Sequence, residues 1–221
     1  MPTPVAVVEE LLNSDWKWFQ QIYVTLQEIL GGYLLSITVG ILFGIVVAWN
    51  DLLRRTFMPA IIFLNGIPKV AAAPIVLVWF GFGKVPNIFM AFLVSFFPIL
   101  LNTSRGLAEV PNEMIELART FNIPKWKRFL KIRIPYSLPY IFTGLKLSAI
   151  MAVIGAIVGE FVASESGLAA LILQAQAYVS TDAMIGALLW ISVITMSLYG
   201  LVSLVERYLM PWTRYGEEEI S

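Results

Sequence analysis

Residues 29–50 read ILGGYLLSITVGILFGIVVAWN, a run of 22 residues without one charged side chain. A helix needs roughly 20 mostly apolar residues to cross about 30 Å of hydrocarbon, so this run is long enough to span a bilayer. Four further stretches have similar length and composition, although two of them hold one lysine each, Lys69 and Lys146. The expected spans are 29–50, 57–80, 85–104, 138–161 and 183–205. An alternative start of the first span at Ile22 places Glu28 near its outer end. The sequence therefore predicts an all-α polytopic membrane protein with about five transmembrane helices.

The composition of the 221-residue chain agrees with this class. Hydrophobic residues make up 58% of the chain and charged residues only 14%, with a mean hydropathy of +0.79. A soluble domain carries about 25% charged residues, so an ordinary water-soluble enzyme is excluded, and a disordered chain more firmly still. The absence of Cys and His from the sequence excludes disulfides, thiol chemistry, imidazole catalysis and the usual zinc sites. A net charge of zero gives no indication of a nucleic-acid partner.

The basic residues predict the orientation, because cytoplasmic loops hold an excess of Lys and Arg. With five spans, the connections after spans one, three and five lie on one side and hold eleven basic residues. These are Arg54, Arg55, Arg105, Arg119, Lys125, Lys127, Arg128, Lys131, Arg133, Arg207 and Arg214. Only Lys17 and Lys84 fall on the other side. We therefore expect the N-terminus outside and the C-terminus in the cytoplasm.

The chain divides into three parts on this reading. Residues 1–20 are expected to form a peripheral N-terminal segment, in which residues 16–19 (WKWF) are typical of an interfacial anchor or else of a loosely ordered tail. Residues 21–213 form the transmembrane domain, with a cytoplasmic loop at 105–135. Residues 214–221 form a cytoplasmic tail.

Small residues and prolines punctuate the expected spans. Small residues recur every four positions in the first span and again in the fourth: Ser36, Gly40, Gly44 and Ala48, then Gly155 and Gly159. Such spacing lets helix backbones approach closely, and we expect tight packing within the chain, with a dimer face as the alternative. Prolines 68, 74 and 98 interrupt helical hydrogen bonding at membrane depth, which is tolerated where protein or a cavity satisfies the freed carbonyls. These spans are expected to bend around or line a pathway.

The loop at 105–135 is the one long polar stretch and contains a predicted amphipathic helix over 113–121. Its apolar stripe consists of Met114, Leu117, Ala118 and Phe121. Asn122 is suited to the left-handed turn that ends a helix, and a second helix over 125–132 is expected to stop before a proline. An apolar face exposed to the cytoplasm predicts docking of a partner protein; the alternative is a helix lying on lipid.

The same loop resembles a known motif. Glu116-Leu117-Ala118, Asn122 and Ile132-Arg133-Ile134-Pro135 are similar to the "EAA" loop of bacterial ABC importer permeases, Glu-Ala-Ala-x₃-Gly-x₉-Ile-x-Leu-Pro. The spacing matches throughout. Leu117, Asn122 and Ile134 depart from the pattern; Asn122 retains the turn, and the other two are apolar exchanges.

The resemblance covers roughly residues 20–213 and points to the nitrate/sulfonate/taurine branch of these permeases. The further matching segments are Gly66-Ile67-Pro68 with Ala71 and Pro74, Trp79-Phe80-Gly81-Phe82-Gly83, Phe97-Pro98-Ile99 with Asn102-Thr103, Leu138-Pro139, Gly144-Leu145-Lys146, Gly159-Glu160 and Gly167-Leu168. It implies the type I ABC importer permease fold in a bacterial inner membrane. Five spans replace the six of many relatives, which carry an extra N-terminal helix.

The resemblance also implies the partners. No Gly-x₄-Gly-Lys-Ser/Thr phosphate loop occurs in the sequence, so we expect no ATPase activity and no cofactor in this subunit. A second copy of the permease, two ATPase subunits that bind ATP and Mg, and an extracytoplasmic solute-binding protein are implied. The implied substrate is a small anionic solute of the sulfonate, nitrate or carboxylate type; the alternative is a thiamine-precursor pyrimidine or riboflavin.

Two other classes of function fit the sequence less well. A secondary transporter or channel requires ionisable groups through the membrane, for which only Lys69 and Lys146 are candidates. A membrane-embedded enzyme requires clustered His, Asp or Glu, or a Ser–Lys pair, and the expected span centres lack such clusters. The ATP-driven importer is favoured over both.

Eleven residues are candidates for function. We expect Glu113, Met114, Glu116, Leu117, Ala118, Phe121 and Asn122 to couple the chain to the ATPase. Lys69, Glu160, Gln174 and Gln176 are candidates for the substrate pathway or an outer gate, the latter formed by a short apolar helix within 167–178. A continuous helix from residue 57 places Lys69 about 18 Å deep, whereas a later start would let it reach the interface, as expected for Lys146. A solvated surface carboxylate is the alternative for Glu160.

Overall fold

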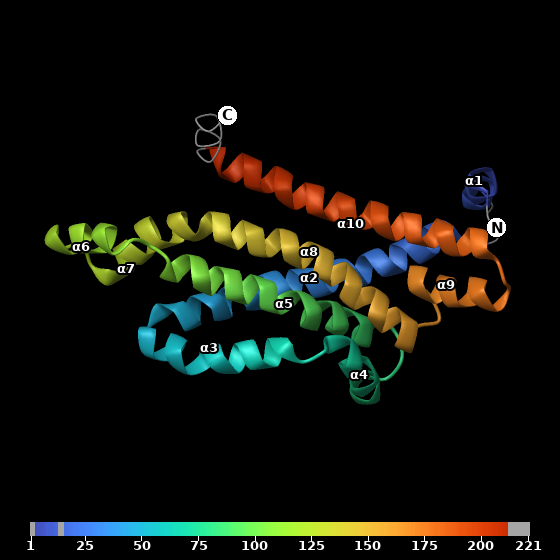
Figure 1. The fold of residues 1–221 in the computed structure, drawn as a ribbon, viewed down its shortest axis with the longest axis horizontal. Coiled ribbons are helices and arrows are strands. Elements are labelled where there is room, and N and C mark those ends of the chain that lie inside the picture. The colour runs from blue at the N-terminus through green and yellow to red at the C-terminus, as the bar shows by residue number, and fades with distance from the viewer. Residues whose placement is uncertain (1–2, 13–15, 212–221) are drawn as a thin grey trace.

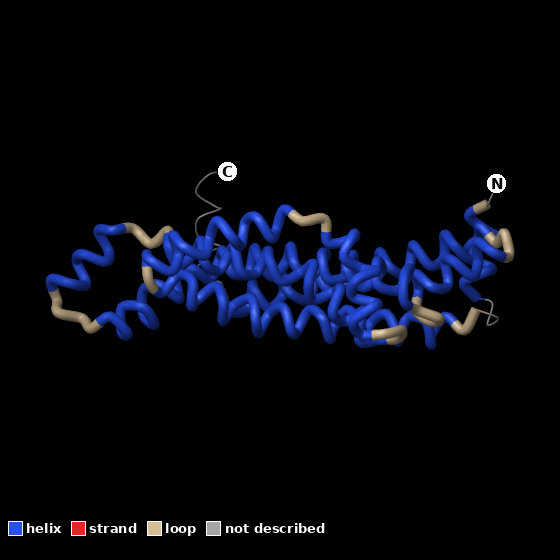
Figure 2. Tube along the Cα trace, turned by 90° about the horizontal axis from the view of Figure 1, so that it is seen from below, coloured by secondary structure: helices blue, strands red, loops and turns tan. Residues whose placement is uncertain are grey.

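The computed structural model of the chain describes residues 3–12 and 16–211, and within these ranges all regular structure is helical. Long helices lie side by side in an elongated bundle (Figure 1), and connecting loops gather toward its ends and at one interruption part-way along (Figure 2). The elements are α1 (Pro4–Leu12), α2 (Trp18–Trp49), α3 (Asp51–Gly66), a 3-10 turn (Lys69–Ala72), α4 (Ala73–Phe80), α5 (Lys84–Ala108), α6 (Asn112–Thr120), α7 (Lys125–Arg128), a π turn (Phe129–Arg133), α8 (Ile134–Ala163), α9 (Leu168–Ala177) and α10 (Thr181–Leu209).

Four of the described helical stretches are long and apolar enough to cross a membrane: α2, α5, the stretch Lys125–Val162 and α10. The fifth expected span is divided into Asp51–Gly66 and Lys69–Phe80, which meet at 79°. The bend expected in this span from its prolines is therefore confirmed. Pro68 explains the break, because the residue before a proline avoids the helical region, and Ile67 has φ −68° and ψ 130°.

Helix α5 is packed tightly between α2 and α8. A Cβ atom added to Gly44 of α2 would lie 2.7 Å from Thr103 Cβ, and one added to Gly155 of α8 would lie 2.7 Å from Ala91 Cα. Between the glycines of α2, the hydroxyl groups of Ser36 and Ser95 are 2.6 Å apart. These close approaches confirm that the repeated small residues serve packing within the chain.

The second helix of the loop at 105–135 does not end where it was expected to end. Helix α7 does not stop before Pro135 but continues through the π turn into α8, where the Ile134 N–H donates to the Phe129 carbonyl. A proline has no N–H and its ring crowds the carbonyl of the preceding turn, and a wider π turn accommodates both effects. The expected end of the second helix at residue 132 is therefore wrong.

The N-terminal segment is attached to the bundle. Helix α1 packs against α10, and Val7 of α1 is buried. Trp18 is also buried, and its indole N–H donates to the Glu10 carbonyl over 3.1 Å. The described residues of this segment are therefore not a loose tail, and residues 214–221 with Arg214 lie outside the described part. The α2–α3 junction, α6 and α7 lie at one end, toward which α10 also ends, while α1 and α9 lie at the other (Figure 1).

Candidate functional site

Helix α6 carries the residues expected to contact an ATPase, and its end has the predicted turn. Asn122 has φ 54°, and its N–H donates to the Arg119 carbonyl over 2.8 Å, while the Ile123 N–H donates to the Ala118 carbonyl over 3.0 Å. This pair of hydrogen bonds is the Schellman motif, which commonly has Gly and sometimes Asn at the left-handed position. Asn122 thus performs the turn for which the related motif uses glycine. Glu113 lies in the first turn of α6, where a carboxylate stabilises the helix.

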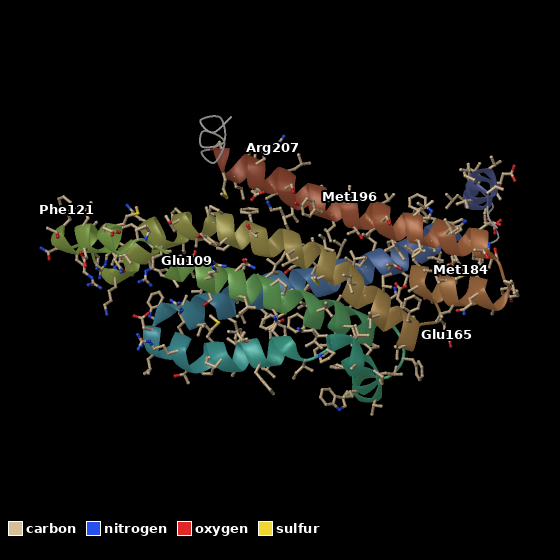
Figure 3. The ribbon with its side chains drawn as sticks, viewed as in Figure 1. Glu109, Phe121, Glu165, Met184, Met196 and Arg207 are labelled. Atoms are coloured by element: carbon tan, nitrogen blue, oxygen red, sulfur yellow. The ribbon has the colours of Figure 1, made fainter. Side chains whose placement is uncertain are left out.

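The predicted apolar stripe of α6 has two orientations. Met114, Leu117 and Phe121 are 44%, 61% and 72% exposed, whereas Ala118 is 4% exposed and faces the molecule. The Glu116 side chain is exposed and makes no hydrogen bond or ion pair with another described residue. Phe121 lies at the extreme end of the molecule (Figure 3). The apolar surface of α6 therefore remains uncovered within one chain.

Lys69 lies directly after the break between α3 and α4. Its Nζ donates to the Asn65 carbonyl and, over 2.8 Å, to Asn65 Oδ1, and it lies 4.8 Å from the centre of the Phe97 ring. The depth of about 18 Å assumed a straight helix, so it does not apply to the bent chain. Lys146 forms a 2.8 Å ion pair with Glu206 of α10.

A polar cluster holds the start of α9 at the opposite end of the molecule. Glu160 is 1% exposed, so the solvated alternative is wrong. Its Oε1 accepts a 2.5 Å hydrogen bond from the Thr25 hydroxyl, and its Oε2 accepts one from the Ala169 N–H over 2.7 Å. The Leu168 N–H donates to Thr25 Oγ1 over 2.8 Å. Free amides at a helix N-terminus favour an anion, and here the carboxylate of α8 supplies it.

Gly167 makes this arrangement possible. It has φ 116° and ψ 167°, a conformation that is essentially restricted to glycine. A Cβ atom added there would lie 2.5 Å from Glu160 Oε2, and the Gly167 N–H donates to Gln21 Oε1 over 2.7 Å. Consecutive amides at the start of α9 are thus bound by side chains of α2 and α8.

Sequence reasoning missed two members of the cluster, Glu28 and Asn87. Both are 0% exposed, and Asn87 Nδ2 donates to Glu28 Oε1 over 2.9 Å and to Ser164 Oγ over 2.5 Å. The available signal was a carboxylate beside an apolar run. The expected first span begins at residue 29 or, in the alternative, at Ile22 with Glu28 near its outer end, whereas α2 begins at Trp18 and includes Glu28 well inside it.

The two glutamines of α9 do not join the cluster. Gln174 Nε2 donates to the Glu165 carbonyl over 3.1 Å, and Gln176 is exposed. Glu165 lies in the connection from α8 to α9, at the end of the molecule opposite Phe121 (Figure 3). Helix α9 has 10 residues, and its other face, which includes Leu171 and Ala175, is buried. It is a short helix seated in the bundle at that end.

Comparison with known proteins gives consistent matches. Residues 37–215 match the family described as binding-protein-dependent transport system inner membrane component. A probable ABC transporter permease protein of Haemophilus influenzae is 35% identical over 90% of this chain and 81% of its own length. The riboflavin transport system permease RibX of Chloroflexus aurantiacus is 34% identical over 96% of this chain and 80% of its own. Permeases named for formylaminopyrimidine, aliphatic sulfonates and nitrate are 28–29% identical.

A solved structure has the same fold. A chain of the methionine ABC transporter MetNI, in an inward-facing conformation, superimposes with a TM-score of 0.74 at 18% identity, over 88% of this chain and 97% of that one. Permeases of this family work with a separate ATPase subunit and a binding protein. The chain belongs to the family of binding-protein-dependent transport system inner membrane components, and it is a permease subunit of an ABC importer with the type I fold.

Proposed function

We propose that two copies of this chain form the translocation pathway of an ATP-driven importer for a small anionic organic solute of the sulfonate, nitrate or carboxylate type. The observation that carries this proposal is the broken span. Helix α3 has no buried residue and packs chiefly against α2, and the chain bends by 79° after it. An interrupted helix at membrane depth is tolerated where protein or a water-filled cavity covers it. A second copy of the chain and a pathway on this side cover the interruption, which a single chain leaves uncovered.

Lys69 supports the anionic class of substrate. Its ammonium group lies at the break, between Asn65 and the Phe97 ring. Charged residues within membrane spans usually face a cavity or a partner rather than lipid. A cavity between two copies would let this cation attract an anionic solute.

The two ends of the molecule suit two different partners. On the cytoplasmic side, Met114, Leu117 and Phe121 enter a groove of the ATPase, and Glu116 pairs there with a basic or amide group. ATP and Mg bind the ATPase, not this chain. On the outer side, α9 is the gate beneath the solute-binding protein, and Glu160 holds its start. The basic residues support this orientation, with the N-terminus outside and the C-terminus in the cytoplasm.

A second candidate substrate is a planar heteroaromatic molecule such as riboflavin or a pyrimidine. The permease RibX, 34% identical over nearly the whole chain, favours this candidate. Trp79 of α4 is 72% exposed and offers an aromatic face on which a flat solute stacks. Lys69 would then bind a carbonyl or phosphate oxygen.

Reconstitution of the permease with its cognate ATPase and binding protein in liposomes tests the proposal. We expect ATP-dependent uptake, and Lys69→Met to reduce uptake of a sulfonate or carboxylate at least tenfold with the complex intact. Unchanged uptake and selectivity in Lys69→Met would refute the pathway role of this lysine. Preferred uptake of riboflavin or a pyrimidine would select the second substrate class.

Coupling through α6 has its own variant and control. Glu116→Lys should abolish stimulation of ATP hydrolysis by the loaded binding protein. Glu9→Lys makes the same charge change on an exposed residue of α1, away from α6, and serves as the control for folding of the chain and its assembly with the ATPase. Full stimulation and uptake in Glu116→Lys would show that α6 does not dock as proposed.

A further inference from the structure

Two buried carboxyl groups meet at the outer end of the bundle without a cation between them. Glu28 of α2 and Glu160 of α8 are 0% and 1% exposed. Glu28 accepts a hydrogen bond from Asn87, and Gly159, the residue before Glu160, lies against the same Asn87, so the two carboxyl groups share one buried cluster. Neither forms a salt bridge with a described residue. Two carboxylates this close in a buried site cannot both keep a negative charge at low cost, so such a pair retains a proton.

The donors around the pair indicate where the proton lies. Glu160 accepts hydrogen bonds at both oxygens, from the Thr25 hydroxyl and the Ala169 N–H. Glu28 accepts one from Asn87 at Oε1, whereas its Oε2 is buried and receives none. A proton on Glu28 Oε2 turns an unpaired acceptor into a donor for Glu160 and removes the repulsion. The charge then remains on Glu160, at the N-terminus of α9.

We propose that Glu28 is a positioning residue that carries a proton and, by donating it to Glu160, keeps the Glu160 carboxylate bound to the start of α9. The inference rests on the proposed role of α9 as the outer gate. When the pair loses its proton, repulsion from Glu28 displaces the Glu160 carboxylate from the Ala169 amide. Helix α9 is then released, and the position of the gate depends on external pH.

The other groups that face the pair do not neutralise it. From α2 these are the uncharged side chains of Gln21 and Thr25, and from the connection after α8 the hydroxyl of Ser164. From α5 they are Asn87 and the charged Lys84, whose ammonium is bound to Gln27 Oε1 over 2.7 Å at the exposed surface. Helix α9 contributes only backbone amides. No described cation is bound to either carboxyl group.

The sequence contains no cysteine, which allows a direct assay of α9. Ala175→Cys places a thiol on its buried face, where Ala175 is 0% exposed, and Gln176→Cys places one at the adjacent exposed position. A buried and an exposed thiol ionise over different pH ranges, so the ratio of the two labelling rates is compared between chains with Glu28 and with Glu28→Gln, in which the two thiols are the same. It would be measured from pH 6 to 10 on the full transporter complex in lipid nanodiscs, and it does not require transport.

We expect the ratio to rise about tenfold or more at alkaline pH with Glu28 present. Glu28→Gln keeps a neutral hydrogen-bond donor, so the ratio should stay low throughout. Infrared spectroscopy at pH 7 should show a protonated carboxylic acid band that Glu28→Gln removes. A ratio independent of pH with Glu28 present, a ratio in Glu28→Gln that rises as it does with Glu28, or an absent acid band would overturn the proposal.

Two further results remain interpretable. If Glu28→Gln does not fold, the infrared pH titration of the unaltered chain decides, because the acid band must be present at pH 7 and disappear as the labelling ratio rises. Uptake is measured separately on the same complexes. A complex with the expected ratio and band that nevertheless transports nothing would refute the proposed function, not the proton on Glu28.

Discussion

Gly167→Ala measures how strongly the start of α9 depends on its contact with Glu160. The φ of 116° at residue 167 costs a non-glycine residue about 1–3 kcal/mol. The added Cβ would also lie 2.5 Å from Glu160 Oε2, and crowding of this kind in a packed interior costs about 1–3 kcal/mol. Together the two effects predict a loss of about 2–6 kcal/mol in the free energy of unfolding.

Gly83→Ala is the matched control. Gly83 also precedes a helix, has φ 116° and ψ −157°, and has no atom within 4 Å of an added Cβ. It therefore shares the conformational cost of Gly167→Ala but not the contact. The difference between the variants should be about 1–3 kcal/mol, or an extra decrease of roughly 2–12 °C in Tm at 2–4 °C per kcal/mol.

Thermal unfolding of the purified protein in detergent or nanodiscs provides the assay. In a Glu160→Ala background, Gly167→Ala should cost less, because the carboxylate that the new Cβ contacts is gone. Equal Tm values for Gly167→Ala and Gly83→Ala would refute the reasoning, since the Glu160 contact would then carry no measurable energy.

Three further changes can be followed by the same unfolding assay. Val179 ends α9 with φ 58°, an unfavourable conformation for a β-branched residue, so Val179→Gly should raise the free energy of unfolding by about 1 kcal/mol; a lower Tm would contradict this. Lys146→Met leaves the half-buried Glu206 without its partner and should lower the free energy of unfolding by about 1–3 kcal/mol. The double variant Lys146→Met/Glu206→Gln should recover part of this loss. An unchanged Tm in Lys146→Met would show that the 2.8 Å ion pair contributes nothing to stability. Hydrogen bonds from Tyr140 and Arg105 lower the pKa of Glu109 below its usual 4.5. The ionised Glu109 therefore stabilises the fold fully above its unfolded-state pKa, and this stabilisation disappears as pH falls through its folded-state pKa. Glu109→Gln should flatten the acid side of the plot of unfolding free energy against pH, and an unchanged plot would exclude this contribution.

Much of the architecture could be predicted from the sequence because the relevant physics is local. An uncharged run such as 29–50 is stable as a helix in hydrocarbon whatever surrounds it, and four of the five spans correspond to long helices. The left-handed turn at Asn122 and the close approach at Gly44 follow from the chemistry of single residues or a short repeat. The motif around Glu116 indicated the family for the same reason, since its spacing is contained in one loop.

Other features were decided only by the tertiary structure. Pro68 predicts a distortion of the helix, but the size of the bend, 79°, depends on how α4 packs against α5 and α8. Pro135 was expected to end a helix, yet the π turn before it keeps the chain helical into α8. In both places the local preference of proline admits several outcomes, and packing of the neighbouring helices selects one.

The polar cluster at the start of α9 is the clearest case. Thr25 and Glu160 are 135 positions apart in the chain and hydrogen-bond only because α2 and α8 meet beside the first turn of α9. In the sequence, Glu28 and Glu160 are two acidic residues near the ends of apolar runs, where a solvated position is the simplest expectation. Whether a carboxylate is solvated or buried with a donor depends on which side chains of other helices surround it. That information is in the packing of four helices, and no local pattern contains it.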